Sequence, residues 1–217
     1  TKVIIIIALV ICCSCSEQII IENDKLQEVI SQVWLDVDLA QKTFGEVETN
    51  NLNEYEEQRY RLAEAHLMLK RELRLPNSSN LDAMANYFAN CKDEASASEA
   101  YYIQGAYLNY IGENTQAMQY LKKAESYPAA SIIRGMTYYK MGRISESEQL
   151  YDIALENYQK ALPYLEEAGL PLYLASVYRE LGRNTCDESK NQYFEKALVA
   201  AQLIGDTILQ MDIRYAQ

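Results

Sequence analysis

The stretch from Glu99 to Tyr127 reads EAYYIQGAYLNYIGENTQAMQYLKKAESY and decides the predicted fold. It contains two short amphipathic segments, which are joined by the tripeptide Gly112-Glu113-Asn114. Apolar residues recur three or four positions apart in both segments, and this spacing predicts two helices. Small residues let the two helices approach closely, at Gly105, Ala117 and Ala124. Large residues fill the space between them, at Tyr101, Leu108 and Leu121.

The same pattern returns twice downstream. Gly135 follows Gly105 by 30 residues (135 − 105), and Ala175 follows Gly135 by 40 residues (175 − 135). The matching positions are Gly135, Tyr138, Gly142, Tyr151 and Ala154 in one copy, and Ala175, Tyr178 and Gly182 in the next. Gly142-Arg143 and Gly182-Arg183 then correspond to the turn of the first hairpin, so we expect a turn at each. Three copies in order predict an array of stacked helix pairs.

These positions resemble the signature of the tetratricopeptide repeat (TPR), a helix–turn–helix unit of about 34 residues. The signature positions of the first copy are Tyr101, Gly105, Leu108, Gly112, Ala117, Leu121 and Ala124. The resemblance implies an all-α fold, a right-handed superhelical α-solenoid of antiparallel helix pairs. The observed spacings straddle the usual period, so we expect insertions and deletions within the repeats.

The predicted organisation has five parts. Residues 1–15 form a signal peptide with a lipoprotein-like cysteine, and residues 16–25 form a tether. Residues 26–95 are degenerate N-terminal helical repeats, and residues 96–205 are TPR repeats (96–127, 128–169 and 170–205). Residues 206–217 are the first helix of a truncated further repeat.

The middle repeat is expected to differ from the others in its helix lengths. One helix should run from Pro128 to Met141, and a long second helix should run from Ser145 towards Glu167. Pro163 lies inside the second helix and should kink or end it, because proline has no backbone N–H to donate.

The N-terminal segment TKVIIIIALVICCSC carries one Lys before an apolar run from Val3 to Ile11. The run is too short to span a bilayer as a helix, which takes about 20 residues, and it fits the apolar core of a secretion signal. Cys15 after Ser14 resembles the lipidation site of bacterial lipoproteins, and the polar stretch that follows is similar to lipoprotein signals of the Bacteroidetes. The resemblance implies a membrane-anchored lipoprotein of the cell envelope, facing the periplasm or the cell surface. Lipidation at Cys13, a plain secretion signal and an N-terminal anchor helix stay open as alternatives.

Residue types that carry catalysis or bind metals are sparse. His66 is the one histidine of the chain and cannot assemble a His-rich metal or acid–base site, so we interpret it as a partly buried structural residue. Once the signal is removed and Cys15 is lipidated, Cys91 and Cys186 remain, and we expect both to be free and buried. The sequence has no Gly-rich phosphate loop and no nucleophile elbow. We therefore predict no enzyme, no cofactor and no metal site.

The formal net charge of −11 bears on the class of partner. An acidic chain is repelled by phosphate backbones, so we predict no direct nucleic-acid binding by this segment. The aromatic residues are 18 Tyr, 3 Phe and 1 Trp. Tyr suits a solenoid that buries the ring and leaves the hydroxyl near water, so most of these residues are interpreted as packing positions.

The TPR resemblance also implies a binding surface, because in that family the first helix of each repeat lines a concave groove that holds a peptide or partner helix. The groove-facing positions are Tyr102, Ala106, Asn109, Tyr110, Ile132, Met136, Tyr139, Lys140, Leu172, Ser176, Arg179 and Glu180. Seven of them are predicted to bind the partner, namely Tyr102, Asn109, Tyr110, Met136, Tyr139, Lys140 and Arg179. Lys140 and Arg179 would hold a carboxylate. The alternative is that these side chains pack on neighbouring repeats or on a further helix.

One TPR subtype is not predicted. Domains that clamp the acidic tail of chaperones use Asn and Lys at set groove positions, where this chain has Ala106, Met136 and Ser176. The leading hypothesis is therefore a non-catalytic scaffold of the cell envelope that binds a protein or peptide of another kind. The alternative is the sensor segment of a membrane-anchored transcription regulator, whose transmembrane and DNA-binding parts would lie beyond Gln217. An enzyme built on the solenoid has no motif in its favour.

Overall fold

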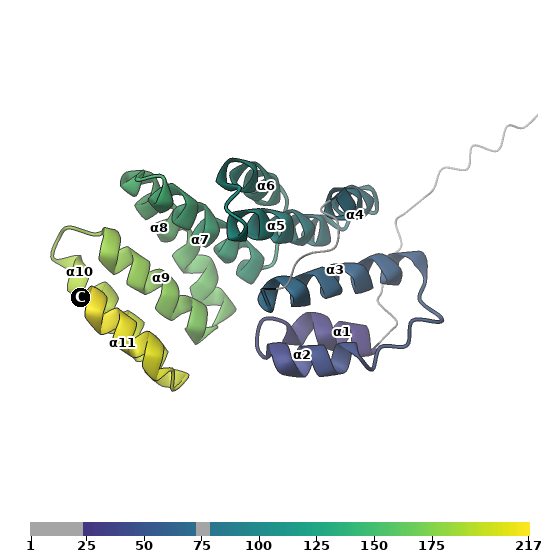
Figure 1. The fold of residues 1–217 in the computed structure, drawn as a ribbon, viewed down its shortest axis with the longest axis horizontal. Helices are drawn as coiled ribbons and strands as arrows, with labels where there is room; N and C mark the ends of the chain where they lie inside the picture. The colour runs from purple at the N-terminus through teal and green to yellow at the C-terminus, as the bar shows by residue number, and fades with distance from the viewer. Residues whose placement is uncertain (1–23, 73–78) are drawn as a thin grey trace, which may run out of the picture.

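The computed structural model describes residues 24–72 and 79–217, and these residues contain helices and no strand (Figure 1). The predicted signal segment with Cys15, and the tether up to residue 23, lie outside the described residues. The helices are α1 (Asp24–Gln32), α2 (Val37–Phe44), α3 (Glu54–Lys70), α4 (Ser79–Asn90), α5 (Glu94–Tyr110), α6 (Asn114–Ser126), α7 (Ser131–Ser147), α8 (Tyr151–Ala168), α9 (Pro171–Asn184), α10 (Ser189–Leu203) and α11 (Thr207–Ala216).

The helices stack in sequence order as antiparallel pairs, α5 with α6, α7 with α8 and α9 with α10. Figure 1 shows an arch in which the first helix of each pair lies on the inner side and the second helix on the outer side. The described residues therefore form a helical repeat solenoid, and the predicted all-α fold class is confirmed.

Close packing within each pair depends on glycines in the first helix. A Cβ atom at Gly105 would lie 2.8 Å from Leu121 Cγ, and a Cβ atom at Gly135 would lie 2.7 Å from Leu165 Cγ. Such distances are shorter than carbon atoms tolerate, so only glycine lets the second helix come this near. The pairing of small and large side chains that the sequence predicted inside the first hairpin is present.

The turns predicted at Gly142-Arg143 and Gly182-Arg183 are wrong, because both glycines lie inside helices. A Cβ atom at Gly142 would lie 2.5 Å from Tyr158 Cε1, and one at Gly182 would lie 3.0 Å from the ring of Phe194. These glycines allow close contact rather than a change of chain direction. The turn between α7 and α8 comes later, where Gln149 adopts a φ of 62°. The first turn is confirmed, because Gly112 has a φ of 87°.

Pro163 was predicted to kink or end its helix. It does not end the helix, because α8 continues to Ala168. Pro163 cannot donate to the carbonyl of Gln159. Both residues are exposed, so water can bond to that carbonyl instead and the helix tolerates the proline.

The N-terminal helices α1, α2 and α3 share a small core of their own, made by Leu26, Val29, Val33, Ala40, Ala63 and Leu67. A second, continuous core runs along the arch through the remaining helices, and α3 contributes Leu62 and Ala65 to it. Trp34, in the turn between α1 and α2, packs against both cores. Trp34 and α3 therefore both join the N-terminal helices to the repeats.

Candidate functional site

The seven residues predicted to bind a partner differ widely in their exposure. Tyr102, Met136 and Tyr139 are buried, with 2%, 5% and 9% of their surfaces exposed. Asn109, Lys140 and Arg179 are partly buried, and Tyr110 is 55% exposed. The aromatic residues that were expected to line an open groove are thus largely covered. Their role in partner binding stays a prediction.

Trp34 is one of the side chains that cover the inner face. Its ring centroid lies 4.6 Å from that of His66, 5.8 Å from that of Tyr102 and 5.6 Å from that of Tyr173. These partners belong to α3, α5 and α9 respectively. The indole therefore lies where the N-terminal helices, the first repeat and the third repeat come together.

Lys70, at the end of α3, completes this contact. Its Nζ atom lies 3.7 Å from the ring centroid of Trp34 and 4.7 Å from that of Tyr173. It also donates a hydrogen bond of 2.5 Å to the Tyr173 hydroxyl, across 103 positions of sequence. Burial raises the pKa of Tyr173 to about 12, so this hydroxyl is neutral at pH 7. We call Trp34, Lys70 and Tyr173 the aromatic bridge, because they connect the two sides of the arch.

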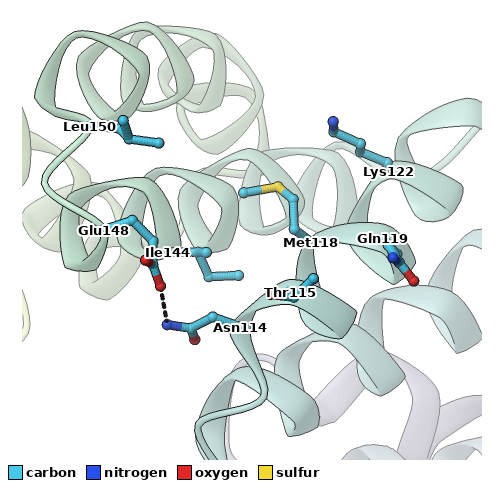
Figure 2. A pocket seen from close by; sticks show the side chains of 8 residues that line it. All are labelled: Asn114, Thr115, Met118, Gln119, Lys122, Ile144, Glu148 and Leu150. Atoms are coloured by element: carbon cyan, nitrogen blue, oxygen red, sulfur yellow. Dashed lines mark hydrogen bonds between the residues drawn. The ribbon is translucent and has the colours of Figure 1, made fainter.

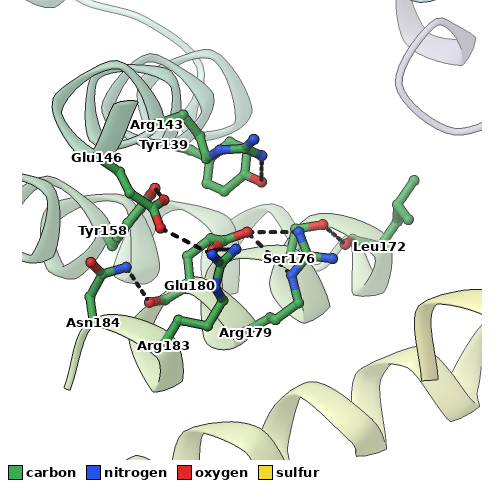
Figure 3. A network of polar contacts seen from close by, with 10 residues as sticks. All are labelled: Tyr139, Arg143, Glu146, Tyr158, Leu172, Ser176, Arg179, Glu180, Arg183 and Asn184. Atoms are coloured by element: carbon green, nitrogen blue, oxygen red, sulfur yellow. Dashed lines mark hydrogen bonds and ion pairs between the residues drawn. The ribbon is translucent and has the colours of Figure 1, made fainter. Parts of the chain in front are cut away.

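A second group of polar side chains lies between α7 and α9 (Figure 3). Glu180, which is fully buried, accepts a hydrogen bond of 2.7 Å from Arg179 Nη2 and one of 3.2 Å from Arg183 Nη1. Glu146 accepts a hydrogen bond of 2.8 Å from the Tyr158 hydroxyl and lies 3.6 Å from Arg183 Nη2. Arg179, which was predicted to hold a partner's carboxylate, therefore already binds the carboxylate of Glu180.

The remaining guanidinium group in Figure 3 belongs to Arg143 of α7. It is exposed, and it donates a long hydrogen bond of 3.4 Å to the Tyr139 hydroxyl. Beside α9 the surface is hollowed, and a cavity of about 500 Å³ is lined by Arg179, Arg183, Asp212, Tyr215 and Ala216. The C-terminal half of the inner face therefore combines open space with exposed arginines. Sequence reasoning had assigned Arg143 and Arg183 to turns and so did not predict them as site residues.

A third polar cluster is buried between α3 and α5. Glu99 accepts a hydrogen bond of 3.2 Å from Arg59 Nη1 and lies 2.9 Å from His66 Nδ1. Burial opposes ionisation of Glu99, but the charge of Arg59 and the hydrogen bonds outweigh it and lower its pKa to about 2. Burial also lowers the pKa of His66, so a neutral imidazole donates from Nδ1. His66 is fully buried, rather than partly buried as predicted.

A cavity on the outer side of the arch lies between α6 and the α7–α8 turn (Figure 2). It has a volume of about 610 Å³ and an apolar floor that includes Met118 and Ile144. Asn114 Nδ2 closes one end by donating to Glu148 Oε1 at 3.2 Å. None of its lining residues was predicted as a site residue, and the cavity has no cluster of cations like that of the inner face.

Residues 24–72 and 79–217 were also searched for other kinds of site. They contain no group of three or more His, Cys, Asp or Glu that could hold a metal ion. No helix within these ranges combines the length and the hydropathy that a membrane span requires. Cys91 and Cys186 are free, as expected, but Cys186 is exposed and Cys91 is only partly buried, so the expected burial is wrong.

Comparison with known proteins finds one kind of relative. The chain is similar to the human (Homo sapiens) protein "SH3 domain and tetratricopeptide repeat-containing protein 2", with 35% identity over 88 residues. The match covers 36% of this chain and 7% of that protein, so the chain spans only a small part of the relative's length. No protein-family model matches, and no solved structure matches. Together with the all-helical fold, the similarity supports a TPR-like repeat protein.

Proposed function

We propose that this TPR-like helical repeat protein is a non-catalytic scaffold that binds a segment of another protein on the inner face of its arch. The cavity between α9 and α11 carries the proposal, because it brings Arg179, a predicted site residue, to an open surface. The cavity is lined by α9 and α11, and the ion pair between Arg183 of α9 and Glu146 of α7 places α7 next to α9. Trp34 and Tyr173 of the aromatic bridge pack against the main core.

Burial of their side chains excludes some of the predicted residues from direct contact with the partner. Tyr102 and Tyr139 are packed inside the arch, and we assign them to shaping the inner face. Tyr110, Lys140 and Arg179 keep exposed or partly exposed side chains and are assigned to contact with the partner. The similarity to a tetratricopeptide repeat-containing protein favours protein binding over catalysis.

Site-specific photo-crosslinking tests which side of the arch binds. A benzophenone amino acid at Leu172, which is 43% exposed on α9, should capture a partner from cells that express the protein. The same amino acid at Ile153, which is 47% exposed on the outer helix α8, is the matched control and should capture at least about five times less. Equal capture at both positions, or capture at Ile153 alone, would remove the inner face from the proposal.

The cell envelope is the proposed location, with the protein anchored through a lipid on Cys15. The support is the apolar run from Val3 to Ile11 followed by Ser14-Cys15 and a polar stretch. Labelling cells with an alkyne fatty acid should tag the wild-type protein in the membrane fraction. Cys15→Ala should lose the tag, whereas Cys91→Ala should keep it. A tag that survives in Cys15→Ala and disappears in Cys13→Ala would move the anchor to Cys13.

A further inference from the structure

A single amine holds two distant parts of the arch in contact. The Nζ atom of Lys70 lies 3.7 Å from the ring centroid of Trp34, 4.7 Å from that of Tyr173 and 2.5 Å from the Tyr173 hydroxyl. Trp34 belongs to the turn between α1 and α2, whereas Tyr173 lies in the first turn of α9. The amine therefore lies between the N-terminal helices and the third repeat, and its charge bears directly on the contact between them.

This amine has no carboxylate partner. Lys70 is partly buried, and within residues 24–72 and 79–217 no carboxylate oxygen lies within 4.0 Å of its Nζ atom. The neighbouring Arg71 pairs with Asp38 of α2 at 2.6 Å. Two aromatic rings and a neutral hydroxyl surround the Lys70 amine instead, and these groups replace water poorly around a full positive charge.

The rings and the loss of water act on this charge in opposite directions. The face of an aromatic ring attracts an ammonium group and so favours the protonated form. Removal from water favours the neutral amine and is the stronger effect where no carboxylate is present. Burial, followed by the charge of Lys140 on α7, lowers the pKa of Lys70 from 10.5 to about 7. The neutral amine keeps its hydrogen bond, because the Tyr173 hydroxyl can then donate to the nitrogen.

Other charged and titratable groups reach this place from every helix that meets the aromatic bridge. They are Asp38 on α2, His66, Arg71 and Glu72 on α3, Glu99 and Tyr102 on α5, Lys140 on α7 and Tyr173 on α9. Burial raises the pKa of Tyr102 and raises that of Tyr173 to about 12. Burial lowers the pKa of His66 and, together with the charge of Arg143, that of Lys140. Lys140 is therefore the second lysine here whose protonation needs a test of its own.

We propose that the aromatic bridge is a proton-sensitive switch: when the Lys70 amine takes up a proton, the contact between α3 and α9 loosens and the arch opens. In the open arch the amine lies in water and binds a proton more tightly than in the closed arch, so protons favour the open form. The pKa of Lys70 is about 7 in the closed form, against the ordinary 10.5 in water. Closure is therefore most stable above pH 10.5, weakens as the pH falls, and changes little below pH 7. Within this window each pH unit changes the ratio of open to closed arches by up to about tenfold.

The single Trp of the chain reports the state of the switch, because Trp34 is part of the aromatic bridge. Quenching of its fluorescence by acrylamide, which is a neutral molecule, measures the access of solvent to the indole. In the wild-type chain the quenching constant should rise at least about twofold between pH 9 and pH 7 and then level off. Lys70→Met should keep the low value at every pH, because Met fills the space between the rings and binds no proton. A wild-type constant that stays level or falls on acidification would overturn the proposal.

The matched control for this change is Lys123→Met on the outer helix α6. The Nζ atom of Lys123 also lies near two rings, 5.2 Å from the centroid of Tyr101 and 4.6 Å from that of Tyr120. It differs from Lys70 in having the Asp82 carboxylate at 3.6 Å. Lys123→Met should keep the wild-type response of Trp34 to pH. Loss of the response in this variant would contradict the assignment to Lys70.

Lys140→Met separates the two lysines. The charge of Lys140 lowers the pKa of Lys70, so its removal should move the response towards higher pH without abolishing it. If Lys140→Met abolishes the response and Lys70→Met retains it, the proton acts at Lys140 and the proposal is wrong. Circular dichroism checks that each variant is folded, and Lys70→Leu takes the place of Lys70→Met if that variant is not.

Opening of the arch is measured separately from the exposure of the indole. Spin labels at Glu64→Cys on α3 and Leu172→Cys on α9, which are both exposed positions, report the distance between the two helices once the native cysteines are replaced by Ser. With Lys70 present the distances should be longer at pH 7 than at pH 9, and in Lys70→Met they should be equal. Equal distances at both pH values with Lys70 present would overturn the proposal even if the quenching of Trp34 changed.

Discussion

Replacing Glu99 with Ala should lower the free energy of unfolding by about 3–5 kcal/mol, because it leaves the buried charge of Arg59 without its carboxylate. Arg59 is only 6% exposed, and its remaining contacts, a hydrogen bond to the Ser96 hydroxyl and the ring of Phe88, carry no negative charge. His66 would lose the acceptor for its Nδ1–H at the same time. Urea unfolding followed by circular dichroism measures the loss.

The control for this change is Glu64→Ala, since Glu64 is an exposed residue on α3. It should change the free energy of unfolding by less than about 0.5 kcal/mol. The difference between the two variants should also depend on pH. The folded-state pKa of Glu99 is about 2, against 4.5 when exposed, so its stabilisation is complete above pH 4.5 and is lost as the pH falls towards 2. A loss in Glu99→Ala that is equal to that in Glu64→Ala, or that grows in acid, would contradict the buried ion pair.

Adding one methyl group at Gly142 is expected to destabilise the middle repeat by about 1–3 kcal/mol. The new Cβ would lie 2.5 Å from Tyr158 Cε1. Tyr158 is fully buried, and its hydroxyl is held by Glu146 at 2.8 Å, so the ring has little room to move away. The better helix propensity of Ala, up to about 1 kcal/mol, reduces the loss but does not cancel it.

Gly45→Ala is the matched control for Gly142→Ala. Gly45 has a φ of −67°, and a Cβ atom there would meet only two backbone oxygens, at 3.4 Å and 3.9 Å. This variant should be as stable as wild type or slightly more stable. Tyr158→Leu provides a second check, because in that background the cost of Gly142→Ala should shrink by at least about 1 kcal/mol. If both glycine variants have equal stability, the contact with Tyr158 does not limit helix approach.

The sequence predicted the stacking of helix pairs because small residues recur where two helices touch. Glycine, which is one of these small residues, also led to the two wrongly predicted turns. Glycine serves both where φ is positive, as at Gly112, and where a neighbouring ring comes close, as at Gly142. The two roles look alike in sequence, since each places a glycine near the end of a helical pattern. The large partner, Tyr158, lies 16 residues further on (158 − 142), and its position depends on the length of the turn.

The sequence predicted only part of the candidate site, because some of its contacts join residues that lie far apart along the chain. The repeat pattern fixes which helices lie on the inner side, and Lys140 and Arg179 were chosen on that basis. The contact between Lys70 and Tyr173 depends on the curvature of the arch summed over several helix pairs, which no local pattern specifies. Trp34 offered one signal, because it is the single Trp of the chain. Arg143 and Arg183 join the site because their helices extend past the glycines that had been interpreted as turns.

The aromatic bridge also bears on the mechanics of the molecule. In an open solenoid each repeat contacts only its neighbours, so the array can stretch and recoil like a spring. Here the hydrogen bond and ring contacts between Lys70 and Tyr173 fasten α3 to α9, which lie 103 positions apart. The span between them is closed by this contact, so we expect it to be stiffer than an open array. A partner that widened the arch would first have to break this fastening, whereas a partner that fits the existing curvature would not.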